Sequence, residues 1–80
     1  MSALHQELRQ LIAEIGEIDD LASITDTVNL YTELGLDSIH TMEIVLEIEQ
    51  RYGVKIPEES LKKIHTLNDV VQLVASAKST

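Results

Sequence analysis

The apolar residues of this chain recur at helical spacing in three separate segments, and this periodicity constrains the fold more than any other feature. Residues 3–16 place them at i, i+4, i+7, i+8 and i+11, as Leu4, Leu8, Leu11, Ile12 and Ile15. This pattern predicts an amphipathic helix that Ser2 can cap and that ends near Gly16. A third helix should begin after Thr66, which forms an approximate capping box with Asp69. Between them, residues 38–52 predict a helix whose apolar side carries Ile39, Met42, Val45, Leu46 and Tyr52.

The segments between these helices are irregular. Residues 17–37 lack an apolar period, so we expect a long connection with a helical turn near residues 30–34, mobile because few periodic contacts tie it down. After Gly53, residues 54–56 look extended but have no second strand to pair with. Pro57-Glu58-Glu59 is typical of a helix start and predicts a short helix that buries Leu61 and Ile64. We therefore predict an all-α fold with one domain, residues 1–80, built as a four-helix bundle of three main helices and one short helix.

Composition and charge argue against several classes of function. The net charge of −8 disfavours binding to nucleic acid or to anionic membrane surfaces. Residues 1–50 hold eleven acidic residues and one basic residue, whereas residues 51–80 hold three acidic and five basic. Such a field attracts cationic partners to the acidic half, although acidity can equally serve solubility alone. The sequence has no cysteine, no apolar run long enough to cross a membrane and no signal-peptide pattern, so we expect a cytoplasmic protein. We also expect a monomer.

Ser38 stands where the loop ends and the predicted second helix begins. Asp37 and Ser38 are both favourable N-cap residues, so the serine is either a helix cap alone or a hydroxyl beside a positive helix end that can carry a phosphate. A hydrolytic nucleophile is disfavoured because the G-x-S-x-G pattern is missing and His40 would point about 200° away from Ser38 on a helix. His5, His40 and His65 are too isolated to predict a metal site.

Several segments taken together resemble the acyl carrier protein family. They are Leu34-Gly35-Leu36-Asp37-Ser38-Ile39, Glu43-Ile44-Val45, Ile48-Glu49, Tyr52, Ile56-Pro57-Glu58-Glu59 and Ile64-x-Thr66-Leu67. The resemblance implies an acyl-carrier-like bundle that is not an enzyme. It also implies that a phosphopantetheinyl transferase attaches 4′-phosphopantetheine from coenzyme A to Ser38, beside Asp37. The thiol of that arm would hold acyl groups as thioesters for enzymes of fatty-acid, lipid or polyketide-type biosynthesis.

The resemblance assigns two further sets of residues. The surface that docks on basic patches of acyl-loading and acyl-transferring enzymes would comprise Asp37, Ile39, His40, Met42, Glu43, Glu47 and Glu49. The interior that shelters the acyl chain would comprise Leu36, Ile39, Met42, Val45, Leu46, Ile56 and Ile64. Typical carriers of fatty-acid synthesis have an acid at the position of His40 and an acidic run at Glu49-Gln50-Arg51, so these differences suggest a specialised carrier. A protonated His40 would oppose the helix dipole but favour a phosphate.

Two alternatives remain open on the sequence. The first is a peptidyl or aminoacyl carrier of the nonribosomal type, which keeps the arm and changes the cargo. The second is an unmodified interaction module that uses only its acidic helix. The acidic composition and the segment Ile56-Pro57-Glu58-Glu59 favour the acyl carrier, and the presence of Ser38 argues against the unmodified module.

Overall fold

The computed structural model describes residues 3–78, and all of the regular elements in that range are helical. They are α1 (Ala3–Gly16), η1 (Leu21–Ser23), α2 (Ser38–Tyr52), η2 (Glu58–Lys63) and α3 (Leu67–Lys78), of which η1 and η2 are 3-10 helices. The predicted all-α bundle of three main helices and one short helix is confirmed. The sequence does not predict η1, because three residues are too few to show an apolar period. Ser2, the expected cap of the first helix, lies outside the described residues.

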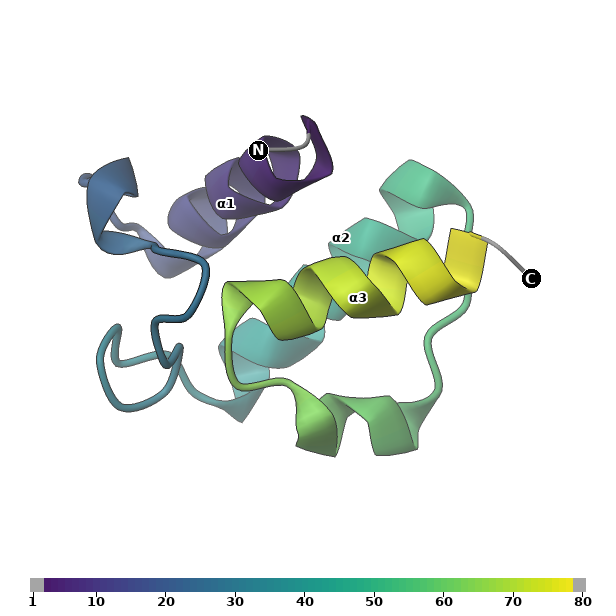
Figure 1. Cartoon of the computed structure of the whole chain (residues 1–80). Coiled ribbons are helices and arrows are strands. Elements are labelled where there is room, and N and C mark those ends of the chain that lie inside the picture. Colours follow the sequence, from purple (N-terminus) through teal and green to yellow (C-terminus); the bar gives the residue numbers. More distant parts are fainter. Residues whose placement is uncertain (1–2, 79–80) are drawn as a thin grey trace.

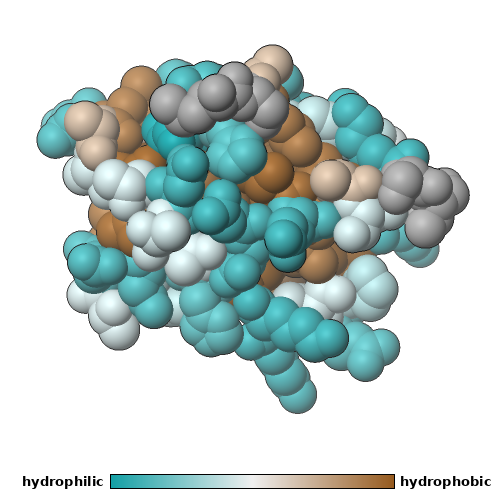
Figure 2. Space-filling model, viewed as in Figure 1, coloured by the Kyte–Doolittle hydropathy of each residue, from teal (hydrophilic) through white to brown (hydrophobic). Residues whose placement is uncertain are grey.

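The three α-helices pack around one hydrophobic core. α1 contacts both α2 and α3, and α2 also contacts α3, while η2 lies at the lower edge of the molecule in Figure 1. That lower edge is hydrophilic on the face shown in Figure 2, and hydrophobic side chains show mainly in the region between α1 and α3. Each large aliphatic side chain contributes about 1.5–3 kcal/mol when buried. The largest fully buried ones are Leu8, Leu11, Ile12, Ile24, Leu30, Ile44, Ile48, Ile64, Leu67, Val70 and Val74.

The buried face of α2 differs from the predicted one. The residues that point inward, at i, i+3, i+4 and i+7, are Thr41, Ile44, Val45 and Ile48. Ile39, Met42 and Leu46 are 65%, 53% and 55% exposed, so the prediction that they lie on the buried face of this helix is wrong. The reason is Thr41, whose hydroxyl finds hydrogen-bond partners inside the protein and can therefore be buried.

α1 ends in a Schellman motif whose left-handed residue is not a glycine. Glu17 has a φ of +55°, and its N–H donates to the carbonyl of Glu14 at 3.4 Å. The N–H of Ile18 donates to the carbonyl of Ala13 at 2.9 Å, which completes the motif. A side chain in this conformation costs about 1–2 kcal/mol relative to glycine. Glu17 is therefore a strained position.

α1 ends at Gly16, as predicted, and the absence of a side chain at Gly16 also matters for packing. A Cβ atom placed on Gly16 would lie 2.8 Å from Cδ2 of Leu36. Leu36 is buried, and it comes two residues before the start of α2. The missing side chain of Gly16 thus lets the loop that leads into α2 pack directly on the end of α1.

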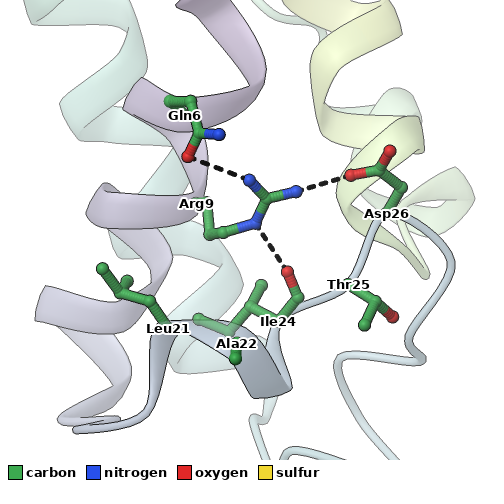
Figure 3. A pocket seen from close by; sticks show the side chains of 7 residues that line it. All are labelled: Gln6, Arg9, Leu21, Ala22, Ile24, Thr25 and Asp26. Carbon is green, nitrogen blue, oxygen red and sulfur yellow. Dashed lines mark hydrogen bonds and ion pairs between the residues drawn. The ribbon is translucent and has the colours of Figure 1, made fainter. Parts of the chain in front are cut away.

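Arg9 anchors the long connection between α1 and α2 (Figure 3). Its guanidinium donates from Nε to the carbonyl of Ile24 at 2.7 Å and from Nη2 to Oδ1 of Asp26 at 2.6 Å. Nη1 donates to Oε1 of Gln6 at 3.0 Å, within α1. The side chain of Arg9 is only 10% exposed. This buried cation holds residues 24–26 against the face of α1.

Two backbone hydrogen bonds tie the same connection to the beginning of α3. The N–H of Leu30 donates to the carbonyl of His65 at 2.8 Å, and the N–H of Asn68 donates to the carbonyl of Asp26 at 3.1 Å. The predicted turn at residues 30–34 is present. The expected shortage of contacts in residues 17–37 is wrong, because hydrogen bonds and buried aliphatic side chains anchor this segment at several points.

The end of α2 and the beginning of α3 form as predicted. Gly53 follows α2 with a φ of +64°. The Thr66–Asp69 capping box is present, with the N–H of Asp69 donating to Thr66 Oγ1 at 3.2 Å and the N–H of Thr66 donating to Asp69 Oδ2 at 3.0 Å. Between these ends, the carboxylate of Glu49 accepts a hydrogen bond from the N–H of Ile56 at 2.9 Å. The extended connector is therefore held to α2 by a side chain.

Candidate functional site

Ser38 is the first residue of α2, and it is exposed. The loop before it turns at Gly35, whose φ of +71° favours glycine, and the N–H of Leu36 donates to the carbonyl of Leu30 at 3.0 Å. Because Leu36 is buried, the chain leaves the core only at Asp37, directly before the serine. The fold thus presents the Ser38 hydroxyl to other molecules at the positive end of a helix of 15 residues.

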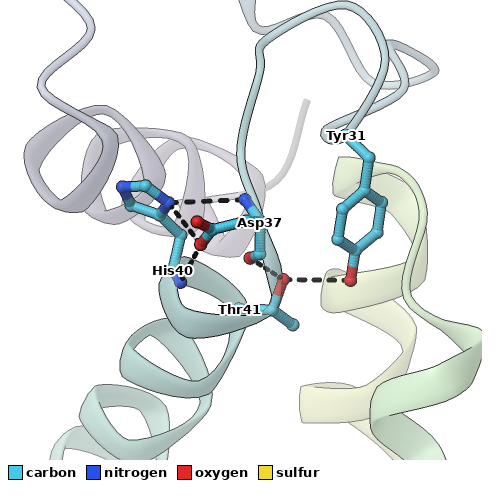
Figure 4. A network of polar contacts seen from close by, with 4 residues as sticks. All are labelled: Tyr31, Asp37, His40 and Thr41. Carbon is cyan, nitrogen blue, oxygen red and sulfur yellow. Dashed lines mark hydrogen bonds and ion pairs between the residues drawn. The ribbon is translucent and has the colours of Figure 1, made fainter.

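Asp37 and His40 form a capping box at this helix end (Figure 4). The Asp37 carboxylate accepts a hydrogen bond from the His40 N–H at 3.0 Å. Nδ1 of His40 lies 2.9 Å from Oδ1 of Asp37 and 3.4 Å from the Asp37 nitrogen. Without a proton, Nδ1 accepts the hydrogen bond from the Asp37 N–H and completes the capping box; with a proton, it donates to the carboxylate instead. His40 is therefore a partner of Asp37, which agrees with the prediction that it does not pair with Ser38.

The same contacts act on the acidity of Asp37. The hydrogen bond from the His40 N–H, followed by the contacts with the imidazole, holds the pKa of Asp37 below its ordinary value of 3.8, although some desolvation opposes this. The residue is thus a carboxylate at neutral pH. Any anion attached to Ser38 will lie beside this negative charge.

Thr41 and Tyr31 support the first turn of α2 from the inside (Figure 4). The Thr41 hydroxyl donates to the carbonyl of Asp37 at 3.1 Å, and the Tyr31 hydroxyl lies 3.0 Å from Thr41 Oγ1. Because the single proton of Thr41 is used toward Asp37, Tyr31 must be the donor in the second bond. The lone pairs of the Tyr31 oxygen remain available as acceptors next to Ser38.

A cavity of about 260 Å³ opens beside the serine. Met42 and Leu61 make its wall largely apolar. The sequence prediction of the site missed Tyr31, Thr41, Leu61 and Lys62 as lining residues; only the spacing of Thr41, three residues after Ser38 on a helix, could have indicated its place. The full lining is Tyr31, Ser38, Thr41, Met42, Leu61 and Lys62.

A second cavity, of about 160 Å³, shares Met42 and Leu61 with the first. The two cavities form a groove between α2 and η2, which we call the α2–η2 groove. Of the predicted acyl-chain residues, this second cavity is lined by Met42, Val45, Leu46 and Ile56, whereas Leu36 and Ile64 are buried in the core and Ile39 lines neither cavity. A larger cavity of about 480 Å³ lies beside Arg9, and none of the predicted site residues lines it.

The outer face of α2 combines exposed apolar residues with acids. Ile39, Met42 and Leu46 are more than half exposed and follow helical spacing, so they form one apolar stripe on the surface. A stripe of this kind on a small protein is typical of an interaction surface.

The acids predicted for docking have different roles in the structure. Glu43 is exposed, and among residues 3–78 it has no ion pair or hydrogen bond through its side chain. Glu47 lies 3.7 Å from Nε of Arg51. Glu49 accepts the hydrogen bond from Ile56 and is half-buried. Glu43 therefore presents its charge to solvent most fully.

The histidines serve as structural partners. Nε2 of His5 lies 3.2 Å from Oδ1 of Asn68, and the His65 ring meets the Tyr31 ring edge-on at 6.2 Å between centroids. In the part of the chain that the structure describes, there is no cluster of three or more His, Cys, Asp or Glu residues suited to a metal ion. Within residues 3–78, no helix has the length and apolar character needed to cross a membrane.

Comparison with known proteins gives consistent matches over nearly the whole chain. A family model described as a phosphopantetheine attachment site matches residues 6–74. An acyl carrier protein of Brachyspira hyodysenteriae is 34% identical over 76 residues, which cover 95% of this chain and 97% of that protein. An acyl carrier protein of Helicobacter pylori is 33% identical over 76 residues, with 95% and 96% covered.

Solved structures show the same similarity. The acetyl actinorhodin acyl carrier protein of Streptomyces coelicolor superposes with a TM-score of 0.79 at 26% identity, covering 99% of this chain and 96% of that one. The acyl carrier protein of Enterococcus faecalis gives a TM-score of 0.69 at 33% identity, with 91% and 96% covered.

Proposed function

The chain belongs to the acyl carrier protein family, whose members hold 4′-phosphopantetheine on a serine and are not enzymes, and we propose that Ser38 is that serine here. The observation that supports this assignment is the position of Ser38: it is exposed, it begins α2, and it lines the α2–η2 groove. A group attached to its hydroxyl can therefore either extend into solvent or lie along an apolar surface of the same protein.

The modification is a phosphoryl transfer that a phosphopantetheinyl transferase catalyses. The Ser38 Oγ forms a bond to the phosphorus that bears the pantetheine, and the P–O bond to the departing phosphate of coenzyme A breaks. Adenosine 3′,5′-bisphosphate leaves, and the hydroxyl proton passes to a base outside this chain. Because the sequence contains no cysteine, the arm supplies the thiol on which acyl groups are carried.

The residues around Ser38 fit a phosphodiester. The N-terminal end of an α-helix stabilises an adjacent anion by about 0.3–1 kcal/mol at an exposed site. The Asp37–His40 capping box secures this end of the helix and leaves the serine side chain outside the box. The chain's own contribution is therefore a rigid, accessible hydroxyl beside a favourable helix dipole.

The α2–η2 groove is the proposed shelter for the acyl chain. Met42, Val45, Leu46 and Ile56 line it, and Leu36 and Ile64 contribute to the core beneath. Ile39 belongs to the exposed stripe and acts in docking instead. A combined volume of several hundred Å³ suits a small apolar ligand.

The outer face of α2 is the proposed docking surface for partner enzymes. Acyl carrier proteins work with transferases and biosynthetic enzymes, and here the contact would combine the apolar stripe Ile39, Met42 and Leu46 with the charges of Asp37, Glu43 and Glu47. Partners with basic patches fit this surface. Glu49 serves the docking face less, because its carboxylate is bonded to the Ile56 N–H.

His40 makes this face less acidic than that of typical carriers, which supports a specialised carrier. It would work as a cytoplasmic monomer for a dedicated pathway of fatty-acid, lipid or polyketide-type synthesis. Partner rates that stay unchanged in a His40→Asp variant would contradict this specialisation.

Mass spectrometry after incubation with coenzyme A, Mg²⁺ and a broad-specificity phosphopantetheinyl transferase tests the central assignment. The protein should gain one phosphopantetheine, Ser38→Ala should gain none, and the matched variant Ser23→Ala, at another exposed serine, should gain one. No gain with several transferases would leave the unmodified interaction module as the better explanation. Loading by an adenylating enzyme with an amino acid, but not with acyl groups, would instead favour the peptidyl carrier.

A further inference from the structure

We infer that Lys62 is the cation that binds the phosphodiester attached to Ser38, so that η2 holds the near end of the arm across the mouth of the α2–η2 groove. This inference rests on the proposed function of Ser38. It adds a specific partner on a second element of the fold.

The geometry places the two residues at one cavity. Ser38 comes from the start of α2 and Lys62 from η2, 24 positions later in the chain, and both line the same space of about 260 Å³. The phosphorus of any group on Ser38 is bonded directly to its Oγ and cannot leave this region. A lysine side chain is long and flexible, so its ammonium can follow that phosphate over the width of the cavity.

The distribution of charge leaves few other cations for this role. Residues 1–50 contain a single Lys or Arg, Arg9, which is buried against Asp26 and Ile24 at another site. On the α2 side, the charged group beside Ser38 is the carboxylate of Asp37, which repels a phosphate, and Nδ1 of His40 is directed at that carboxylate. Among the residues that line the cavity beside Ser38, the cationic one is Lys62 of η2.

Lys62 is the lysine of η2 that has access to the cavity. Lys63, its neighbour, is exposed but does not line that space. Within residues 3–78, Lys62 forms no ion pair in the structure, although Glu58 and Glu59 line an adjacent cavity with it and compete for its ammonium. A phosphodiester fixed by a covalent bond at the shared cavity has a high effective concentration at Lys62, as do the two carboxylates of the same helix.

The apolar lining suits the stem of a lysine side chain. Met42 and Leu61 flank the site, and the methylene groups of a lysine can lie along such a surface while the ammonium reaches the anion. The arm would then leave Ser38 toward η2, which keeps Ile39 free for a partner enzyme, since Ile39 lines neither cavity of the groove.

NMR spectroscopy of the lysine side-chain ammonium groups in the unmodified and modified protein tests the inference. In protein that mass spectrometry shows to carry the arm, the Nζ signal of Lys62 should shift, whereas that of Lys63 should change much less. Ser38→Ala treated with the same transferase should show no shift at Lys62. Equal shifts of Lys62 and Lys63 would overturn the inference while leaving the attachment at Ser38 intact, and failure to attach the arm would overturn both.

Matched charge-removing variants provide the second readout. Lys62→Gln should increase the motion of an isotope-labelled arm and abolish its dependence on salt, and Lys63→Gln, with the same change in net charge, should not. A shift of the Lys62 Nζ signal that occurs only when the arm carries a carboxylate-terminated acyl group would assign Lys62 to the cargo and refute the phosphodiester assignment. The arm bearing a free thiol and the arm bearing a neutral acyl group distinguish these two anions.

Discussion

Replacing Arg9 by methionine should destabilise the protein by about 2–3 kcal/mol, and the contacts of Arg9 explain this value. Methionine preserves most of the apolar stem but none of the donors. The carbonyl of Ile24, a residue with no exposed surface, loses the hydrogen bond from Nε, and an unsatisfied buried acceptor costs about 1–3 kcal/mol. The side chain of Asp26 is 39% exposed and can regain water, so the loss of its ion pair with Arg9 should add less than about 1 kcal/mol.

Urea denaturation at neutral pH measures this effect. A domain of this size has a net stability of roughly 3–5 kcal/mol and a dependence on urea of about 1 kcal/mol per molar, so the midpoint of Arg9→Met should fall by about 2–3 M. The urea midpoint of Arg9→Lys should lie between those of the wild-type protein and Arg9→Met, because one ammonium cannot replace the forked guanidinium. Asp26→Ala should lower stability by no more than about 1 kcal/mol.

The comparison of these variants can refute the reasoning. If Asp26→Ala destabilises the protein as much as Arg9→Met, the ion pair and not the Ile24 carbonyl is the dominant contact. If Arg9→Met changes stability by less than about 1 kcal/mol, Arg9 does not anchor the connection as the structure indicates.

Three further predictions follow from the ends of α1 and α2 and from Tyr52. Glu17→Gly should raise the free energy of unfolding by about 0.5–1 kcal/mol in urea denaturation, because glycine removes the left-handed strain but gains unfolded-state entropy; a decrease would contradict this. The pKa of Asp37 lies below 3.8, so the stability that its carboxylate contributes is present above pH 3.8 and is lost as the pH falls through the folded-state pKa. An NMR titration of the Asp37 carboxyl should show a midpoint below 3.8. Asp37→Ala should remove the contribution of this carboxyl from the pH dependence of stability. Burial and the neighbouring Glu7 raise the pKa of Tyr52 above 10.0, so the stability of the protein should fall as the pH rises from 10.0 through the folded-state pKa. The stability of Tyr52→Phe should not change in this pH range. Equal losses of stability in both proteins would show that Tyr52 is not the cause.

The helices and their ends could be predicted from the sequence because they depend on local patterns. Ser38 as the first residue of α2, Gly53 after its end and the Thr66–Asp69 capping box all follow from residue types at fixed spacing. The residue that pairs with Asp37 in the capping box of α2 could not be predicted, because His40 stands where a capping box usually has glutamate or glutamine. The imidazole acts as a capping group because its Nδ1 lies 3.4 Å from the Asp37 nitrogen.

The orientation of α2 could not be predicted from hydrophobicity alone. Thr41 counts as polar in a pattern, yet it is buried because the Asp37 carbonyl and the Tyr31 hydroxyl satisfy it. Once Thr41 points inward, Ile39 and Met42 must point outward. The residues that a pattern assigns to the core are thus available for partners.

The anchoring of the long connection depends on contacts between residues distant in sequence. Arg9 reaches Asp26 across 17 positions, and no local pattern indicates that an arginine of an amphipathic helix is buried. The cavity beside Ser38 likewise depends on Lys62 and Tyr31, which no motif connects with the serine. Such contacts follow from the tertiary arrangement alone.

The backbone hydrogen bond between Leu30 and His65 can be used to measure how often the α2–η2 groove opens. His65 follows η2 by two residues, so outward movement of η2 strains this bond before it disturbs the core. The amide proton of Leu30 should then exchange with solvent in step with groove opening, whereas that of Asn68, bonded to Asp26 from within α3, should exchange mainly on global unfolding. The ratio of the two exchange rates should be compared between protein with an empty arm and protein with a loaded arm. This comparison would report how much the cargo changes the free energy of groove opening, without any label on the cargo itself.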